Sequence, residues 1–263
     1  MKENITFIIP IHVFNTEVEK YLERAVNSIK ENCDSKKNTV IIVGPSDVLN
    51  KSDVVYHKTK CKCSLQLLEN KDEKTDPFTQ INMAVYKCLT PYFSVIELDD
   101  EYYAYWINEV DKYIGSDMSA SVYIPLTELV NTEDKIVSFA NEIALSNSFA
   151  NELGLIDIES LESYMDFNVT GSVIKTEDFI SAGGLKPSLN LAAWYEFLLR
   201  MCHNSHTVRV IPKVGYRHTV GRSDSYSELK NKEVTPEYVQ WLIKTAQQEY
   251  FFKEDRNKEY DGE

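Results

Sequence analysis

The sequence has few cysteines, and their number is odd. Five cysteines in 263 residues exclude the dense disulfide framework that stabilises small secreted domains. This usage favours a reducing compartment, so we expect a cytoplasmic protein. Cys61 and Cys63 are a closely spaced pair of the kind that begins zinc sites. No second pair of ligands follows at zinc spacing, which argues against structural zinc.

Long apolar runs and basic residues are also scarce. The first apolar run has only seven mostly apolar residues, too few for a signal peptide with its flanks or for a membrane span. Lysine and arginine number 28 against 41 aspartates and glutamates, for a net charge of -13. So acidic a protein does not bind nucleic acid or an anionic membrane through its overall field. A nucleotide diphosphate would be repelled too, unless a local divalent cation offset the charge.

Apolar segments of strand length alternate with helix-like segments in the first hundred residues. Buried strands are expected over 5–13, 39–43 and 92–98, with short strands at 54–56 and 64–68. Helices are expected after Asn15 and over 78–88. This alternation indicates a parallel sheet wound with helices. In such sheets, ligands bind beyond the carboxyl ends of the strands.

The second half of the sequence has a mixed pattern. Helices are expected over 105–114, from Thr176, over 191–201, and from Thr235 to about Phe252; strands are expected over 122–125, 168–174 and 208–212. No repeat, low-complexity segment or linker is present. We therefore expect one domain over residues 1–252, followed by a charged tail over 253–263.

Three adjacent acids, Asp99, Asp100 and Glu101, follow the strand expected at 92–98. Because alternate residues of an extended chain point the same way, Asp99 and Glu101 would face one side and could hold Mg²⁺ or Mn²⁺. The alternatives are a solvated acidic turn and the start of a helix.

Several segments, in the same order along the chain, resemble family 2 inverting glycosyltransferases. They cover 5–15, 39–43, 80–84, 92–101, 167–172, 183–185, 195–200 and 216–223. The resemblance implies a GT-A nucleotide-diphospho-sugar transferase-like fold: α/β, with a mixed, mostly parallel sheet flanked by helices. Its nucleotide-binding half would be 1–101 and its acceptor-side half 102–226, with a C-terminal helix over 235–252. The amino-acid sequence also resembles glycosyltransferase-like proteins of tailed bacteriophages, which would place the protein in the host cytoplasm or the virion.

The resemblance also implies roles for individual residues. It implies donor contacts at Pro10, His12, Asn15, Asn82, Asp100, Arg222 and Ser223. It implies metal ligands at Asp99, Glu101 and His218, with Mn²⁺ or Mg²⁺ as the cofactor. It implies acceptor-side positions at Gly183, Gly184 and Trp194. The Arg222 guanidinium would neutralise the diphosphate, while His218 and Arg222 as ordinary surface or core residues remain the alternative.

Two positions depart from the family pattern. The second strand runs into Gly44, where the family has an acid for the nucleobase. Where the family has an acidic pair with the general base, this chain has Ala193 and Trp194. Glu196 is the nearest carboxylate, but it lies about 200° further around a helix. Asp166, from a neighbouring segment, is the other candidate base, while Trp194 would stack on a sugar or pack in the core.

Three functions are compatible with these features. The first is a metal-dependent glycosyltransferase of the hexosyltransferase type, moving a sugar from a nucleotide-diphosphate donor to an unknown acceptor, with inversion. The second is a catalytically degenerate binding or structural protein, such as a virion or assembly component with protein partners. The third, a nucleotidyltransferase, would also use paired carboxylates, but the sequence lacks a glycine-rich phosphate loop.

Overall fold

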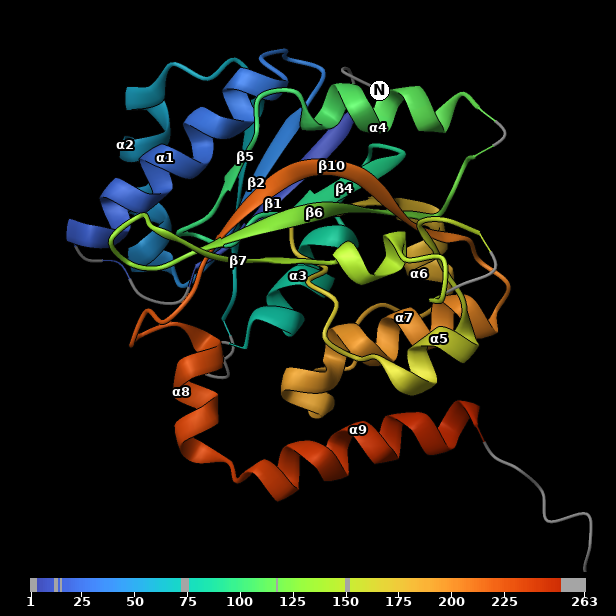
Figure 1. Ribbon diagram of the computed structural model, residues 1–263. Coiled ribbons are helices and arrows are strands. Elements are labelled where there is room, and N and C mark those ends of the chain that lie inside the picture. Colours follow the sequence, from blue (N-terminus) through green and yellow to red (C-terminus); the bar gives the residue numbers. More distant parts are fainter. Residues whose placement is uncertain are drawn as a thin grey trace, which may run out of the picture.

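The computed structural model describes residues 4–11, 14, 16–71, 76–116, 118–149 and 152–251 (Figure 1). His12, Asn15 and the tail over 253–263 lie outside the described residues. Within the described part, no helix has both the length and the apolar character needed to cross a bilayer.

Ten strands of the described residues form one mixed sheet. They are β1 (Ile5–Pro10), β2 (Thr39–Gly44), β3 (Ser64–Glu69), β4 (Tyr92–Val95), β5 (Glu101–Tyr102), β6 (Val122–Val130), β7 (Ile136–Ala140), β8 (Leu155–Ile156), β9 (Val173–Lys175) and β10 (Val208–Thr219). The order is β3-β2-β1-β4-β9-β6-β10-β5, with β7 beside β6 and β8 beside β10. β9 runs antiparallel between β4 and β6, so β1, β2, β3, β4, β6 and β10 share one direction. The expected mostly parallel α/β sheet is confirmed.

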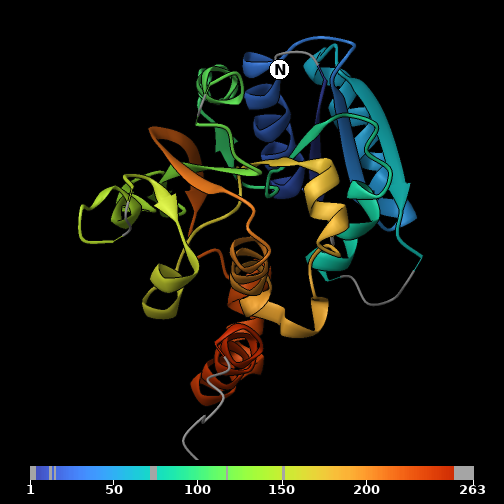
Figure 2. The same ribbon diagram turned by 90° about the vertical axis from the view of Figure 1, so that its right-hand side faces the viewer.

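Helices cover both faces of this sheet (Figures 1 and 2). They are α1 (Thr16–Asn32), α2 (Ser46–Thr59), α3 (Pro77–Val85), α4 (Trp106–Ile114), α5 (Ile158–Ser163), α6 (Thr176–Ser181), α7 (Ala193–His203), α8 (Tyr226–Glu233) and α9 (Pro236–Tyr250), with 3-10 turns η1 (Glu142–Leu145) and η2 (Pro187–Ala192). Phe7 and Ile9 join the core under α1, α2 and α4, whereas Ile8 joins the core with α3, α6 and α7. This two-sided burial is why β1 is apolar at consecutive positions.

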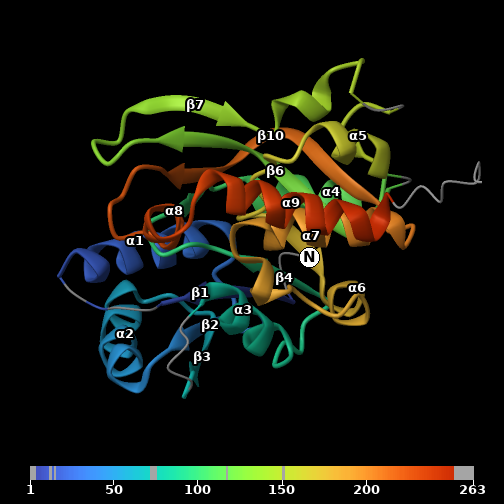
Figure 3. The same cartoon turned by 90° about the horizontal axis from the view of Figure 1, so that it is seen from below.

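The C-terminal part adds two helices beneath the α/β core. Thr235 caps α9 by accepting a hydrogen bond from the Tyr238 backbone N–H, as its sequence position predicts. α9 packs against α7 and η2 (Figure 3). α8 was not expected from the sequence, because it is short and has no continuous apolar stripe.

One strand prediction is wrong and another is only partly right. Residues 54–56 belong to α2, where Val55 and Tyr56 are buried and Val54 is exposed. Three consecutive apolar residues do not distinguish a strand from part of a helix. Of the strand expected over 168–174, only Val173 and Ile174 lie in β9, because the preceding residues form a turn with Gly171 at φ +80°.

Candidate functional site

A cleft of about 1320 Å³ opens at the edge of the sheet where β1, β4 and β10 end. Pro10, Glu97, Asp99 and His218 line it on the strand side. The N-terminus of α3, the segment 165–170, η2, the first turn of α7, and α8 form the remaining walls. The cleft thus lies at the edge at which open α/β sheets bind their ligands.

The acids after β4 form a turn rather than a continuation of the strand. β4 ends at Val95, and residues 97–100 turn before β5 begins at Glu101. The alternation expected for Asp99 and Glu101 therefore does not apply. Instead, Glu97, Asp100 and His218 each present a ligand atom, all within 4.8 Å of one another.

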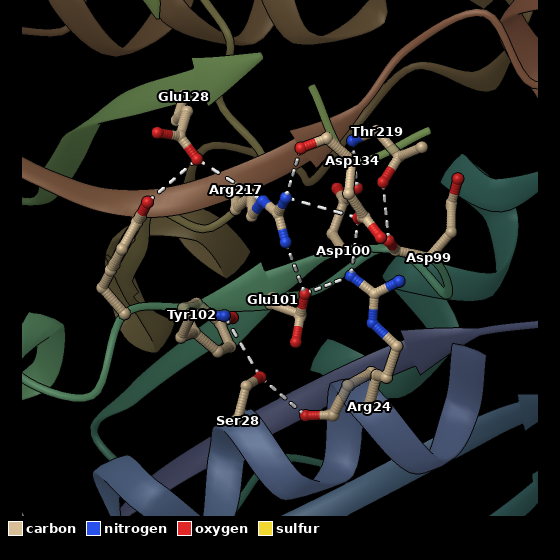
Figure 4. Close-up of polar contacts among 12 residues, drawn as sticks. Arg24, Ser28, Asp99, Asp100, Glu101, Tyr102, Glu128, Asp134, Arg217 and Thr219 are labelled. Atoms are coloured by element: carbon tan, nitrogen blue, oxygen red, sulfur yellow. Dashed lines mark hydrogen bonds and ion pairs between the residues drawn. The ribbon is translucent and has the colours of Figure 1, made fainter. Parts of the chain in front are cut away.

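Asp100 holds the end of β10 in place. Its Oδ2 lies 2.8 Å from His218 Nδ1, and its Oδ1 accepts the Thr219 backbone N–H at 2.9 Å. The Thr219 hydroxyl donates to the Asp99 carbonyl oxygen at 2.9 Å (Figure 4). Because Nδ1 of His218 is committed to Asp100, its Nε2 is the nitrogen that remains for a ligand.

Asp99 lies beside this group and is only partly satisfied. Its Oδ1 is 3.2 Å from Arg222 Nη1, and its buried Oδ2 has no hydrogen-bond partner. The Arg222 guanidinium also lies over the Tyr21 ring, 5.6 Å from its centroid. A buried carboxylate oxygen without a partner is costly, so this atom is a position at which a cation would be stabilised.

Burial and crowding raise the pKa values of these acids. Burial raises the pKa of Glu97 to about 7, with His218 opposing the shift and Asp100 adding to it. Burial and the Asp100 charge raise the pKa of Asp99 to about 6, against the effect of Arg222. Burial alone would lower the pKa of His218, but Asp100, Glu97 and Asp99 together raise it to about 10. Burial is thus the main cause of the shifts at the two acids, whereas the neighbouring carboxylates cause the shift at His218.

Glu101 belongs to a different cluster. It forms ion pairs with Arg24 of α1 and Arg217 of β10, and both arginines also pair with Asp134. Arg217 further contacts Glu128 of β6 (Figure 4). Glu101 does not occur among the described residues that line the cleft. The structure thus places Asp99, Asp100 and His218 together and Glu101 with arginines.

Close packing beneath the cluster fixes the turn. The Tyr216 hydroxyl accepts the Glu97 backbone N–H at 3.0 Å. A Cβ atom on Gly171 would lie 2.3 Å from the Tyr216 ring, so only glycine allows this approach. The Trp106 indole N–H donates to the Gly171 carbonyl oxygen at 2.9 Å. Residues from α4, β10 and the segment before β9 thereby position Glu97.

Asn82 and the glycine pair at 183–184 come together, but not in the cleft. The Asn82 amide donates to the Leu185 carbonyl oxygen and accepts the Leu185 N–H, both at 2.8 Å. Gly184, at φ +71°, packs against Asn82 Oδ1. Asn82, Gly183 and Gly184 are not among the described residues lining the cleft, and Ser223 is exposed outside it. The contacts of Asn82 with Leu185 and Gly184 therefore have a structural role: they hold α3 against the glycine turn.

The two candidate bases have different surroundings. Glu196 is fully buried, and its carboxylate is bound by Arg200, Lys186 and the Tyr250 hydroxyl. Asp166 is exposed and lines the cleft, as does Trp194. Glu196 and Trp194 thus lie on different faces of α7, as the helical spacing predicts.

No protein-family model matches the sequence, and no curated protein sequence matches it. Solved structures are nevertheless similar. S. aureus TarS 1–349 in complex with UDP-GlcNAc matches at a TM-score of 0.70 and 14% identity, over 95% of this chain and 68% of that one. The mannosyltransferase PcManGT from Pyrobaculum calidifontis, in complex with GDP-Man and Mn²⁺, matches at 0.63 and 12% identity, over 93% of this chain and 69% of that one. The chain has a GT-A fold.

A longer structure of TarS also matches, and the chain covers 43% of it. At identities of 12–14% the likeness shows the fold alone. Any activity therefore depends on the residues of the cleft.

Proposed function

We propose that the chain is a metal-assisted glycosyltransferase that moves a sugar from a nucleotide-diphosphate donor to an acceptor hydroxyl, with inversion. The acidic cluster of Glu97, Asp99, Asp100 and His218, beside a large cleft in a GT-A fold, carries this proposal. The neighbours crystallised with UDP-GlcNAc, and with GDP-Man and Mn²⁺, support the choice of donor class.

The residues present fit a divalent cation. Carboxylate oxygens and an imidazole nitrogen suit Mn²⁺, and carboxylate oxygens suit Mg²⁺. The unpartnered Asp99 Oδ2 and the grouping of Glu97, Asp100 and His218 within 4.8 Å support a cation at this position. A cation held by these residues and His218 would draw charge from the leaving nucleoside diphosphate.

The remaining roles fall to Arg222, Asp166 and Trp194. Arg222 lies at the acidic cluster and could turn its guanidinium toward a diphosphate, which it would bind through paired hydrogen bonds. In an inverting transfer, a base removes the proton of the attacking acceptor hydroxyl. Asp166 is the candidate for this base because its side chain is exposed and lines the cleft. Trp194 offers an aromatic surface to the acceptor.

Calorimetric titration of UDP and GDP, with and without Mn²⁺, tests the proposal. We expect one of the two nucleotides to bind, and Mn²⁺ to strengthen its binding. A screen of sugar nucleotides for hydrolysis then identifies the donor. Absence of binding to both nucleotides, with and without Mn²⁺, would refute the donor class.

Asp166→Asn tests the base. We expect the rate of sugar transfer to fall by about 10²- to 10⁴-fold, because the amide cannot accept the acceptor proton. Calorimetry should show unchanged nucleotide affinity. Glu159→Gln, on α5 outside the cleft lining, is the matched control and should keep the full rate. An Asp166→Asn protein that transfers sugar at the wild-type rate would assign the base elsewhere.

A second function, a GT-A-fold protein that binds without catalysis, is favoured by two observations. Ala193 and Trp194 occupy the positions expected for the acidic pair, and Glu196 is buried in ion pairs. In addition, Arg222 pairs with Asp99 and His218 with Asp100, so these two carboxylates already have partners within the chain. Such a protein would bind the nucleotide without hydrolysing or transferring any sugar, so the hydrolysis screen separates the two functions.

A further inference from the structure

Three connecting loops lie together at the amino edge of the sheet, opposite the cleft. These amino-edge loops are residues 33–38 before β2, 60–63 before β3 and 86–91 before β4. Thr6 of β1 is in register with both Thr39 of β2 and Phe93 of β4, so the strands begin in one row. In Figure 1, the C-terminal end of α1 lies at the top, whereas α8, one wall of the cleft, lies at the lower left.

Hydrogen bonds join the first two of these loops. The Ser64 backbone N–H donates to the Asn38 carbonyl oxygen at 2.8 Å, and the Ser64 hydroxyl donates to the Lys36 carbonyl oxygen at 3.0 Å. The Lys62 backbone N–H donates to Asp34 Oδ1 at 2.6 Å. The lysines of the two loops therefore belong to one surface.

The amino-edge loops are basic, although the whole chain carries a net charge of -13. They contain one acidic residue, Asp34, and five exposed lysines: Lys36, Lys37, Lys60, Lys62 and Lys87. Asp34 pairs with Lys62 at 3.2 Å. At physiological salt, charges further away than a Debye length of about 8 Å are largely screened. The potential at this edge is therefore set by the lysines and not by the net charge of the protein.

The loop before β4 adds exposed apolar side chains beside the lysines. Leu89 is 100% exposed and Tyr86 is 58% exposed. Leu89 thus adds nothing to the core, but its side chain is available for burial against a partner. Tyrosine is enriched at membrane–water interfaces, where its ring is in apolar surroundings and its hydroxyl stays hydrated. Lysines next to an exposed leucine and tyrosine are typical of a surface that contacts the headgroup region of a bilayer.

We propose that the amino-edge loops dock the protein on a bilayer that carries anionic headgroups. The five lysines attract the headgroups, and Leu89 enters the boundary between headgroups and acyl chains. The cleft opens at the opposite edge of the sheet, so it faces away from the bilayer and stays accessible from the aqueous phase.

The composition of this surface favours a bilayer over nucleic acid. Proteins that bind single-stranded nucleic acid stack bases on aromatic side chains and use the planar guanidinium of arginine. The amino-edge loops contain no arginine, and Tyr86 is their one aromatic residue. A fully exposed leucine has no phosphate to bind, whereas a bilayer buries it.

Sedimentation of the full chain with vesicles tests the proposal. We expect the protein to pellet with vesicles of phosphatidylcholine and phosphatidylserine in equal parts, and at least about tenfold less with phosphatidylcholine alone. Sodium chloride at about 1 M should release most of the protein, because the Debye length falls to about 3 Å. Protein that stays in the supernatant with the anionic vesicles at low salt overturns the proposal.

Charge reversal assigns the contact to the lysines. Lys36→Glu/Lys37→Glu should weaken binding to the anionic vesicles by at least about tenfold. Lys135→Glu/Lys244→Glu is the control with the same net charge. Lys135 precedes β7, which begins beside the carboxyl end of β6, and Lys244 lies on α9. Its binding should fall by less than about threefold. Equal losses in the two double variants would contradict the docking surface.

Removal of one apolar side chain tests the contact of Leu89. Leu89→Ser should weaken vesicle binding by about tenfold, because the leucine side chain no longer leaves water. Ile136→Ser removes a side chain that is 59% exposed, but on β7, and should bind like the wild type. A thermal melt shows that each variant is folded. A Leu89→Ser protein that binds like the wild type would exclude insertion of this loop.

Hydrogen–deuterium exchange of the unmutated chain locates the contact without any variant. Anionic vesicles should slow exchange in residues 33–38 and 86–91 and leave the cleft segment 165–170 unchanged. Protection of the cleft segment alone would refute the orientation. A single-stranded DNA oligonucleotide that displaces the protein from the vesicles at equal phosphate concentration would assign the lysines to nucleic acid and overturn the proposal. These measurements contain no nucleotide sugar, so their outcome is independent of the proposed transferase activity.

Discussion

Asp100→Asn should weaken Mn²⁺-dependent nucleotide binding by about 10- to 100-fold, the usual cost of removing a carboxylate that holds a metal-binding histidine. Asp100 contacts both His218 Nδ1 and the Thr219 N–H, so the neutral amide loses charge and cannot satisfy both groups as acceptors with equal strength. Titration of Mn²⁺ into the nucleotide complex measures the change.

The adjacent residue provides a matched control. Glu101→Gln removes an equal charge one position along the chain, but from the cluster with Arg24 and Arg217. We expect its Mn²⁺ affinity to stay within about twofold of the wild type, because screened, partly exposed charges interact weakly over distance. Glu97→Gln should weaken Mn²⁺ binding like Asp100→Asn, and a thermal melt shows whether each variant is folded. If Glu101→Gln is the variant that loses Mn²⁺, the assignment of the cluster is wrong.

This pair of variants also separates what the sequence could and could not predict at the site. An acidic group after a buried strand is visible in the sequence, because the apolar run ends where the acids begin. The direction of each carboxylate is not visible, because it depends on where the strand ends. β4 stops at Val95, so a turn replaces the alternation that would have placed Asp99 and Glu101 together. Glu97 was missed because it appeared to belong to the strand.

The same limit applies to the fold. Consecutive apolar residues in β1 and β2 are sufficient to predict a sheet covered on both faces. Residues 54–56 have a similar short apolar run, but they belong to α2. Val55 and Tyr56 are buried there by contacts with distant parts of the chain, which three residues of sequence do not reveal. The arginines that hold Glu101 come from α1 and β10, and their pairing follows from the strand order β6-β10-β5. No local pattern encodes that order.

Glu196→Gln should destabilise the protein by about 3–5 kcal/mol, the cost of removing one partner of a buried ion pair. Glu196 is fully buried, lies 2.8 Å from Arg200 Nη2 and 2.9 Å from Lys186 Nζ, and accepts the Tyr250 hydroxyl at 2.6 Å. The neutral amide leaves two cations uncompensated where α7 meets α9. For a chain of this size the melting temperature should fall by roughly 10 °C.

Glu249→Gln is the control for this effect. Glu249 also pairs with Lys186, at 2.9 Å, but its side chain is 56% exposed. Solvent screens such a pair, so the loss should stay below about 1 kcal/mol. A Glu196→Gln protein that melts like the wild type but loses sugar transfer would instead identify Glu196 as the catalytic base.

The pH dependence of the unfolding free energy is a second test of the buried ion pair at Glu196. Burial alone would raise the pKa of Glu196, but Arg200, Tyr250 and Lys186 together hold it below the ordinary value of 4.5. A carboxyl group with a lowered pKa in the folded state stabilises the protein above its unfolded pKa, and this contribution is lost as the pH falls through the folded pKa. The difference in unfolding free energy between wild type and Glu196→Gln should therefore be constant from pH 7 to about 5 and shrink below about 4.5. Denaturant titrations at pH 7, 5 and 3.5 measure it, and a difference that grows toward low pH would contradict the ion-pair assignment.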